Sequence, residues 1–181
     1  MNPAINVAEP AMSTAYARLI SLLDSARARY RLIDHAPEGR TLEASVLRGH
    51  PAPQAAKCMV ARIKIAKGTA CHALAVIPGD RRADLGRLTE VLGGRSAALA
   101  ARATAEALTG CVSGSILPFS FHPDLHLITD PDLLVHQELF FNAARLDQSI
   151  ALATEDYVAL AQPRIEPISD LPASFTSLRT R

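Results

Sequence analysis

A lysine inside an apolar run and a glycine-rich loop further along the chain are the parts of this sequence that could do chemistry. Lys57 lies within the apolar residues 55–61, where an ammonium group must either extend to solvent or work in a partly dry pocket. The loop at residues 110–119 carries two glycines and a proline, so its backbone N–H groups can approach a ligand closely. Together, a cation and a loop of backbone donors suit a polarised carbonyl or a phosphate-bearing substrate.

Three cysteines offer alternative nucleophiles or metal ligands, and we interpret them as small buried thiols. Cys58, Cys71 and Cys111 are odd in number, far apart and without a CxxC pair, which favours a reducing compartment over a disulfide framework. They also lack the spacing of a zinc site, so we expect no metal and no cofactor. Cys58 follows Lys57 directly, but neighbouring side chains of a strand point to opposite faces, so Cys58 is expected in the core.

The net charge of +1 conceals an uneven distribution of charge. Residues 27–67 hold nine Lys/Arg and three Asp/Glu, a net charge of +6, whereas residues 120–181 hold four Arg and nine Asp/Glu, a net charge of −5. A basic region can bind a polyanion, although an ordinary solvated surface remains the alternative. The basic region lacks the interleaved aromatic residues of single-strand nucleic-acid binders.

Composition places the chain among folded domains. It has 181 residues, of which 49% are hydrophobic, and this predicts one domain with a buried core rather than a disordered chain. No apolar stretch approaches the roughly 20 residues of a membrane helix. The first ten residues show neither the basic nor the apolar segment of a secretory signal. We therefore expect a cytoplasmic protein with no membrane partner.

Hydrophobic spacing and turn residues predict the elements that must position these groups. Helices are expected over residues 13–26, 41–48, 83–92, 96–108 and 154–161. Strands are expected over residues 30–35, 57–66, 70–77, 125–129, 138–141 and 149–152. A turn at residues 67–69 joins two of these strands into a β-hairpin that begins at Lys57. Hairpins interrupted by helices indicate an α+β fold with a mixed, mainly antiparallel sheet.

Residues at the predicted helix ends and the expected bounds of the domain complete this outline. Ser13, Ser96 and Thr154 are predicted N-caps, and Gly49 is predicted to end its helix at C′. A flexible N-terminal arm, one compact domain and an irregular C-terminal tail are expected at residues 1–11, 12–168 and 169–181.

Six segments match, in order and spacing, the motifs of a known family. They are Arg48-Gly49-His50, Gln54-Ala55-Ala56-Lys57, Ala75-Val76-Ile77-Pro78-Gly79-Asp80, Leu108-Thr109-Gly110, residues 114–119 and Phe141-Asn142-Ala143-Ala144-Arg145-Leu146. On these segments the chain resembles the YbaK / prolyl-tRNA-synthetase-associated (editing-insertion) domain family over roughly residues 28–168. The resemblance implies a single compact domain whose curved mixed sheet is barrel-like and flanked by helices.

The resemblance also implies an activity, namely hydrolysis of aminoacyl-tRNA that carries the wrong amino acid. The sequence shows no synthetase domain, so the expected protein is a free-standing deacylase that edits in trans. The family suggests a small amino acid such as alanine, cysteine or serine. The expected partners are the 3′ end of aminoacyl-tRNA and, as a further candidate, an aminoacyl-tRNA synthetase.

Carried over to this chain, the family's functional lysine is Lys57 and its glycine-rich loop runs from Gly110 to Pro118. Lys57 is expected to bind the terminal phosphate or ribose, with a role as general base as the alternative. Backbone N–H groups around Gly114 are expected to stabilise the oxyanion. Because the family's chemistry draws on a ribose hydroxyl and a bound water, no protein nucleophile is required.

Other residues near the matched segments are weaker candidates for binding the substrate. Ser113 and Ser115 could offer hydroxyls to the amino acid, although loop serines more often satisfy nearby backbone groups. His50 could line the pocket or lie in a surface loop. Asn142 could hydrogen-bond the substrate or stabilise a turn.

The chain departs from the family pattern at several positions. Cys58-Met59 replaces a common Thr-Leu, and Ser120 replaces a common glycine. Ala144-Arg145 follows Asn142-Ala143 where glycine is more common. The alternative function is therefore a non-catalytic module of the same fold that binds a tRNA 3′ end, a nucleotide or a partner protein.

Overall fold

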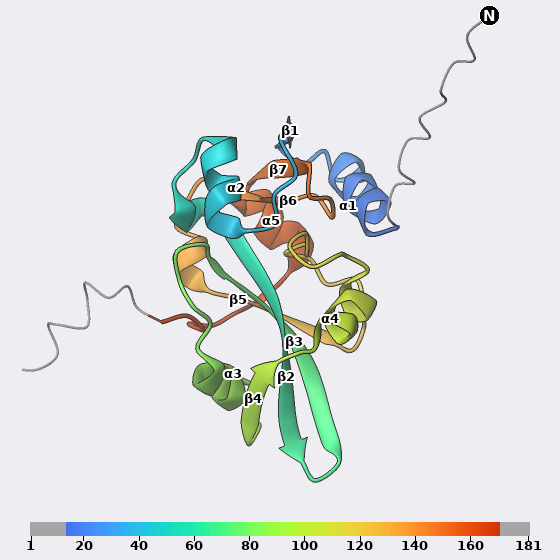
Figure 1. Cartoon of the computed structure of the whole chain (residues 1–181), viewed down its shortest axis with the longest axis vertical. Coiled ribbons are helices and arrows are strands. Elements are labelled where there is room, and N and C mark those ends of the chain that lie inside the picture. The colour runs from blue at the N-terminus through green and yellow to red at the C-terminus, as the bar shows by residue number, and fades with distance from the viewer. Residues whose placement is uncertain (1–13, 171–181) are drawn as a thin grey trace, which may run out of the picture.

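The computed structural model describes residues 14–170, which form two β-sheets flanked by helices (Figure 1). The first sheet is antiparallel, and its strands in spatial order are β1 (Tyr30–Asp34), β7 (Gln148–Ala153) and β6 (Glu138–Asn142). The second sheet is mixed, and its strands in spatial order are β4 (Ser96–Leu99), β2 (Ala56–Ala66), β3 (Thr69–Pro78), β5 (Leu125–Thr129) and β8 (Arg164–Ile165). An isolated bridge between Ala55 and Phe140 joins the two sheets where β2 begins.

Helices surround both sheets. The α-helices are α1 (Thr14–Ser25), α2 (Thr41–Arg48), α3 (Leu85–Val91), α4 (Arg102–Thr109) and α5 (Thr154–Ala161). Two short 3₁₀ helices are η1 (Ala52–Gln54) and η2 (Pro131–Leu133). The predicted α+β domain with a mixed sheet is confirmed, although the strands form two sheets and close no barrel. None of the helices in the described part of the chain is long and apolar enough to cross a membrane.

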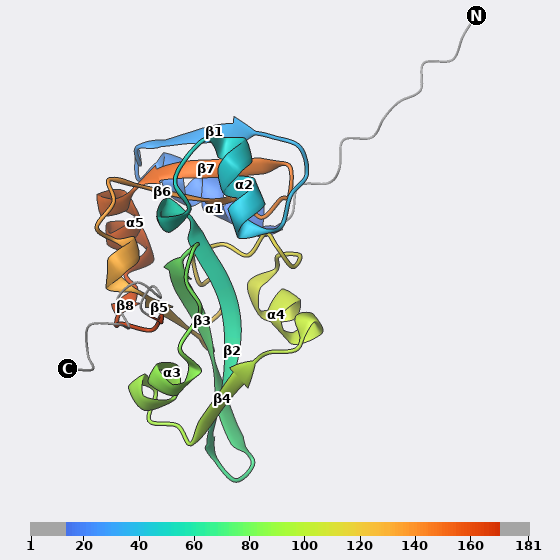
Figure 2. The same ribbon diagram turned by 60° about the vertical axis from the view of Figure 1, so that its left-hand side comes forward.

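The β2–β3 hairpin divides the core in two. One face of β2 carries Ala56 and Val60 into a large core that also contains Phe119 and Tyr157. The other face carries Ala61 and Ile63 into a smaller core under α3. Because side chains alternate along a strand, Lys57 and Cys58 lie on opposite faces at the start of β2. The two views in Figures 1 and 2 show α2 beside this start, while the hairpin tip lies at the other end of the molecule.

Residues 96–99 were predicted to begin a helix, and this prediction is wrong. They form β4, which pairs antiparallel with the free edge of β2, Ala61 opposite Leu99 and Lys64 opposite Ser96. Pairing with an open strand edge outweighs the helix propensity of alanine, because the edge would otherwise leave its backbone groups unpaired. The alanine-rich helix α4 therefore begins only at Arg102.

The predicted helix ends have mixed outcomes. Gly49 has φ 71° and donates its N–H to Val46, as a glycine at C′ does. Thr154 is not an N-cap: it is the first residue of α5, and its hydroxyl donates to the His136 carbonyl at 2.6 Å. Ser13 lies outside the described residues, as do the predicted arm and residues 171–181 of the predicted tail.

Candidate active site at the start of α2

The glycine-rich loop closes onto the segment that leads into α2. Gly114 has φ +90°, and a Cβ atom at this position would lie 2.8 Å from the Gly39 Cα atom and 3.1 Å from the Gly39 carbonyl oxygen. No side chain fits between the two backbones, so position 114 requires glycine for both space and conformation. Gly114 is also exposed, which leaves its backbone open to a ligand.

Asn142 holds this contact in place. Its side-chain amide nitrogen donates to the Glu38 carbonyl at 2.8 Å and to the Gly114 carbonyl at 2.9 Å, while its Oδ1 atom accepts from the Ser149 hydroxyl at 2.9 Å. Since both polar atoms are used within the protein, Asn142 positions the two loops. This geometry supports the predicted turn-stabilising role over direct binding of substrate.

A small cavity of about 60 Å³ lies beneath Gly114 and Asn142. Cys58 lines it from β2, and Ala44 lines it from α2. Burial raises the pKa of the Cys58 thiol, so it stays protonated near neutral pH. Cys58 therefore presents a small apolar surface to the cavity and is unsuited to act as a nucleophile, as the sequence predicted.

Arg48 also lines the small cavity, and sequence reasoning did not single it out as a site residue. Its Nη1 atom donates to the Ser149 hydroxyl at 3.3 Å, and its Nε atom has no hydrogen-bond partner among the described residues. Burial lowers its pKa to about 10, so it keeps its charge at neutral pH. The available signal was its place in the matched segment Arg48-Gly49-His50, at the end of a helix that faces the loop.

Lys57 lies on the opposite face of β2, in a second cavity of about 260 Å³. Its Nζ atom donates to the Arg81 carbonyl at 3.0 Å, and Arg82 lies in the same cavity wall. Thr41, the first residue of α2, lines both this cavity and the small one. The N-terminus of α2 therefore separates Lys57 from Gly114, and the two predicted residues face adjoining cavities rather than one.

The N-terminus of α2 is itself suited to bind an anion. Its N-cap residue, Arg40, makes no side-chain cap, so the first N–H groups of the helix lack that partner. The helix dipole adds partial positive charge at this end. Lys57 and Arg82 add positive charge beside this helix end, and Glu43 and Asp80 line the same cavity. The junction of the two cavities is thus the place where a phosphate or a carbonyl oxygen would meet both the helix end and Lys57.

The other predicted loop residues serve the loop itself. Gly110 ends α4 with φ 68°, and its N–H donates to the Glu106 carbonyl at 2.9 Å. The Ser113 N–H donates to the Glu106 carboxylate at 2.9 Å. Ser115 is fully buried, and its hydroxyl donates to the Val112 carbonyl at 3.0 Å. Pro118 is buried as well. Of the loop residues predicted to bind substrate or stabilise the oxyanion, Gly114 lines the small cavity, and Ile116, which was not predicted, lines it too.

His50 packs outside both cavities. Its ring stacks on Phe140 with centroids 3.8 Å apart and planes 13° from parallel, and its Nδ1 atom lies 2.9 Å from the Pro51 carbonyl. Burial lowers its pKa to about 4, so the ring is neutral at physiological pH. The structure therefore places His50 beside the site's supporting elements and away from the predicted substrate contact.

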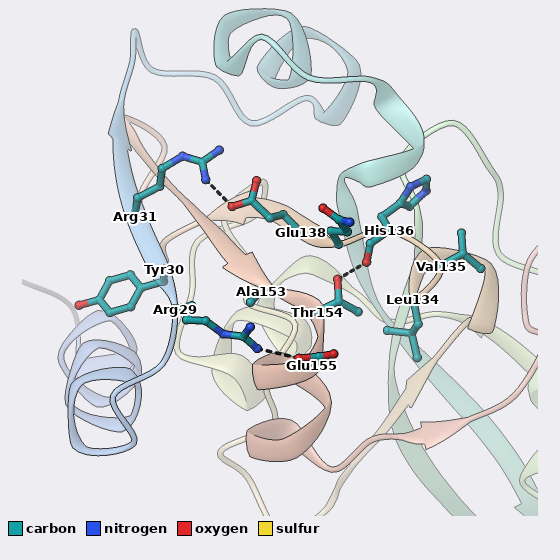
Figure 3. A pocket seen from close by; sticks show the side chains of 11 residues that line it. Arg29, Tyr30, Arg31, Leu134, Val135, His136, Glu138, Ala153, Thr154 and Glu155 are labelled. Atoms are coloured by element: carbon teal, nitrogen blue, oxygen red, sulfur yellow. Dashed lines mark hydrogen bonds and ion pairs between the residues drawn. The ribbon is translucent and has the colours of Figure 1, made fainter.

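A further cavity, of about 790 Å³, lies elsewhere, between β1, β6 and the start of α5 (Figure 3). Arg29 forms an ion pair with Glu155 across it, and Arg31 pairs with Glu138. None of the predicted site residues lines it. These two arginines are therefore neutralised by carboxylates within the cavity walls.

Comparison with known sequences gives a consistent match. The aminoacyl-tRNA editing domain family matches residues 36–160. The multifunctional Ser/Thr-tRNA deacylase ProXp-y of Escherichia coli strain K12 is 42% identical over 154 residues, which cover 84% of this chain and 92% of that protein. The protein of the same name from E. coli O157:H7 matches to the same extent.

Solved structures share the fold. The hypothetical protein APE2540 has a TM-score of 0.75 at 20% identity, over 84% of this chain and 99% of the other. A protein proposed to be a trans-editing enzyme for prolyl-tRNA synthetase has a TM-score of 0.73 at 21% identity, over 89% of this chain and all of the other. From the match over residues 36–160 and the 42% identity to the E. coli protein, this chain belongs to the aminoacyl-tRNA editing domain family.

Proposed function

We propose that this protein is a free-standing deacylase that hydrolyses the ester between a mischarged amino acid and the 3′-terminal ribose of tRNA. The observation that carries the proposal is the junction of two cavities at the N-terminus of α2, with Gly114 on one side and Lys57 on the other. An ester placed across this junction has an amino acid on one side and a phosphate-bearing ribose on the other.

The backbone at Gly114 is the proposed stabiliser of the transition state. Attack on the ester carbonyl gives a tetrahedral intermediate with negative charge on the former carbonyl oxygen. A backbone N–H directed at that oxygen typically contributes about 3 kcal/mol to lowering the barrier. The absence of a side chain at Gly114 allows the approach, and Asn142 fixes the loop in advance.

Lys57 is the proposed positioning residue for the nucleotide. Its half-buried ammonium lies in the wider cavity, which suits a terminal ribose and phosphate. Because its Nζ atom already donates to the Arg81 carbonyl, positioning is favoured over general-base catalysis. The attacking water is then assisted by the substrate's own ribose hydroxyl, as the family resemblance implies, and the protonated Cys58 takes no covalent part.

The small cavity is the proposed site for the amino-acid side chain. A volume of about 60 Å³ admits only a few heavy atoms, which selects serine, threonine, alanine or cysteine over larger residues. Arg48 supplies a hydrogen-bond donor there, which favours a side chain with a hydroxyl group. Serine and threonine are therefore the first candidates, and they are the amino acids in the name of the 42% identical E. coli protein.

The proposed setting is the cytoplasm, where aminoacyl-tRNA is made and used. A synthetase is the proposed partner that would deliver its mischarged product. Direct capture of tRNA from solution is the simpler arrangement, and it requires a nucleic-acid-binding surface on this chain.

The test is release of labelled amino acid from a panel of charged tRNAs that includes seryl-, threonyl-, alanyl- and cysteinyl-tRNA. We expect rapid hydrolysis of one or two species by the wild type and a large loss in Lys57→Ala. No acceleration over buffer for any species would reject the deacylase and favour the alternative, a binding module with the same pocket. The Cys58-Met59 departure from the family pattern is the observation that keeps this second function in view.

A further inference from the structure

The outer half of the β2–β3 hairpin, together with the residue before β4, carries positive charge without neighbouring carboxylates in the sequence. Residues 44–79 contain no Asp or Glu. Arg62 and Lys64 on β2, Lys67 in the turn and Arg95 before β4 are all exposed. None of the ion pairs found among residues 14–170 includes any of these four. We refer to these four residues as the basic ribbon.

Strand register places two members of the ribbon, Arg62 and Lys64, on one face of β2. Arg62 and Lys64 alternate with Ile63, which is buried in the smaller core, so both point away from that core. Ala98 lies opposite Arg62, while Ala70 and Ser96 lie opposite Lys64. His72 lies opposite Arg62 on β3, and both cations remain exposed. The Arg95 N–H donates to the Lys64 carbonyl at 2.7 Å, so the backbone of a further exposed arginine lies beside Lys64.

The ribbon runs away from the candidate site. At about 3.3 Å per residue, Lys64 lies about 23 Å along β2 from Lys57, and the turn at Lys67 lies farther still. Figures 1 and 2 show the hairpin extending from α2 to the opposite end of the molecule. By strand alternation Arg62 and Lys64 lie on the face of β2 that carries Cys58, opposite to Lys57. A substrate bound at the candidate site must therefore be a long polyanion that follows the twisted hairpin to reach the ribbon, and an aminoacyl nucleotide is too short.

We propose that the basic ribbon binds the sugar–phosphate backbone of the base-paired RNA stem whose charged 3′ end occupies the candidate site. The inference rests on the proposed function and names the surface that recognises the body of the substrate. Phosphate contacts of this kind position a nucleic acid without reading its sequence. They also make affinity depend on salt, because bound counterions are released.

The ribbon's composition favours RNA over a protein or a lipid surface. Arg62 and Lys64 share their face with alanine, serine and histidine, and no large apolar side chain lies among these cross-strand neighbours. Protein interfaces usually bury an apolar centre, and membrane-bound surfaces insert apolar side chains. A basic ribbon without such a centre matches the regular negative charge of a nucleic-acid duplex.

The experiment compares two substrates and two double variants. The substrates are full-length aminoacyl-tRNA and a short aminoacylated CCA fragment that cannot reach the hairpin. The test variant is Lys64→Gln/Lys67→Gln. The control is Arg87→Gln/Arg164→Gln, which changes net charge equally at exposed arginines paired with Glu90 and Glu166.

We expect kcat/KM of the test variant on full-length tRNA to fall about tenfold, mainly through KM, with a salt slope smaller by about two. Hydrolysis of the fragment should match the wild type, and the control should match it on both substrates. The proposal would be overturned if the test and control variants had equal kcat/KM on full-length tRNA. It would also be overturned if the test variant lost kcat/KM equally on full-length tRNA and on the fragment. If the wild type hydrolyses neither substrate, the proposed function fails, and the ribbon is judged by binding of uncharged tRNA, which the test variant alone should weaken.

Discussion

The Nζ atom of Lys57 donates to the Arg81 carbonyl at 3.0 Å, and this hydrogen bond joins the start of β2 to the turn that follows β3. The ammonium is thereby held at one wall of the wider cavity, on the face of β2 away from Cys58. One of its N–H groups is used in this bond, and the others remain for a ligand. The lysine is therefore oriented before substrate arrives, which lowers the entropic cost of positioning the ester.

Replacing Lys57 by alanine should reduce kcat/KM for deacylation by about 100-fold while leaving the fold intact. The side chain is only half-buried, so little packing is lost, and the melting temperature should stay close to that of the wild type. Lys67→Ala is the matched control for the short aminoacylated fragment, because it removes a lysine that is far from the site. Retained activity on that fragment in Lys57→Ala would contradict the assigned role.

Replacing Gly114 by alanine should abolish activity and destabilise the protein by about 1–3 kcal/mol from backbone strain alone. The new Cβ atom would lie 2.8 Å from the Gly39 Cα atom, so the loop must also move. Gly68→Ala is the control, because Gly68 has φ +78° but a Cβ atom added there would meet no atom within 4 Å. Both variants should show backbone strain, and only Gly114→Ala should also displace the loop. Chemical denaturation and deacylation assays on both variants therefore separate the two effects.

The sequence predicted most elements because their signals were local. Gly49, for example, ends α2 where the pattern placed it. The error at residues 96–99 arose because a long-range contact, pairing with the edge of β2, outweighed the local preference of alanine for helix. Local patterns carry no information about which distant strand edge is left open.

The candidate site was predicted only in part, because its assembly also depends on contacts between distant parts of the chain. Lys57 and Gly114 were identified by their types and motifs, but their placement in adjoining cavities depends on how α2 packs between them. Arg48 was missed because an arginine on a short helix usually faces solvent. Its burial appears only when the loops carrying Gly39 and Gly114 close over it.

Replacing Arg48 by methionine should change amino-acid preference more than stability. Methionine keeps much of the side-chain volume and removes a poorly solvated charge, so the free energy of unfolding should not fall greatly. Loss of the donor should lower the ratio of kcat/KM for seryl- over alanyl-tRNA by about tenfold. Arg102→Met, at an exposed position of α4, is the control. An unchanged ratio in Arg48→Met would show that Arg48 does not recognise the hydroxyl.

The free energy of unfolding should fall in mild acid because His50 is buried as a neutral ring. Burial lowers its folded-state pKa to about 4, below its ordinary value of 6.5, so the unfolded chain binds the proton more readily between these two pH values. Its contribution to the free energy of unfolding is therefore complete above pH 6.5 and is lost progressively as pH falls toward 4. Denaturant titrations from about pH 4.5 to about pH 7.5 should show a shallower dependence of the free energy of unfolding on pH in His50→Gln than in the wild type. An identical slope in wild type and His50→Gln would mean that another group dominates the acid response, and that the stack on Phe140 tolerates a protonated ring.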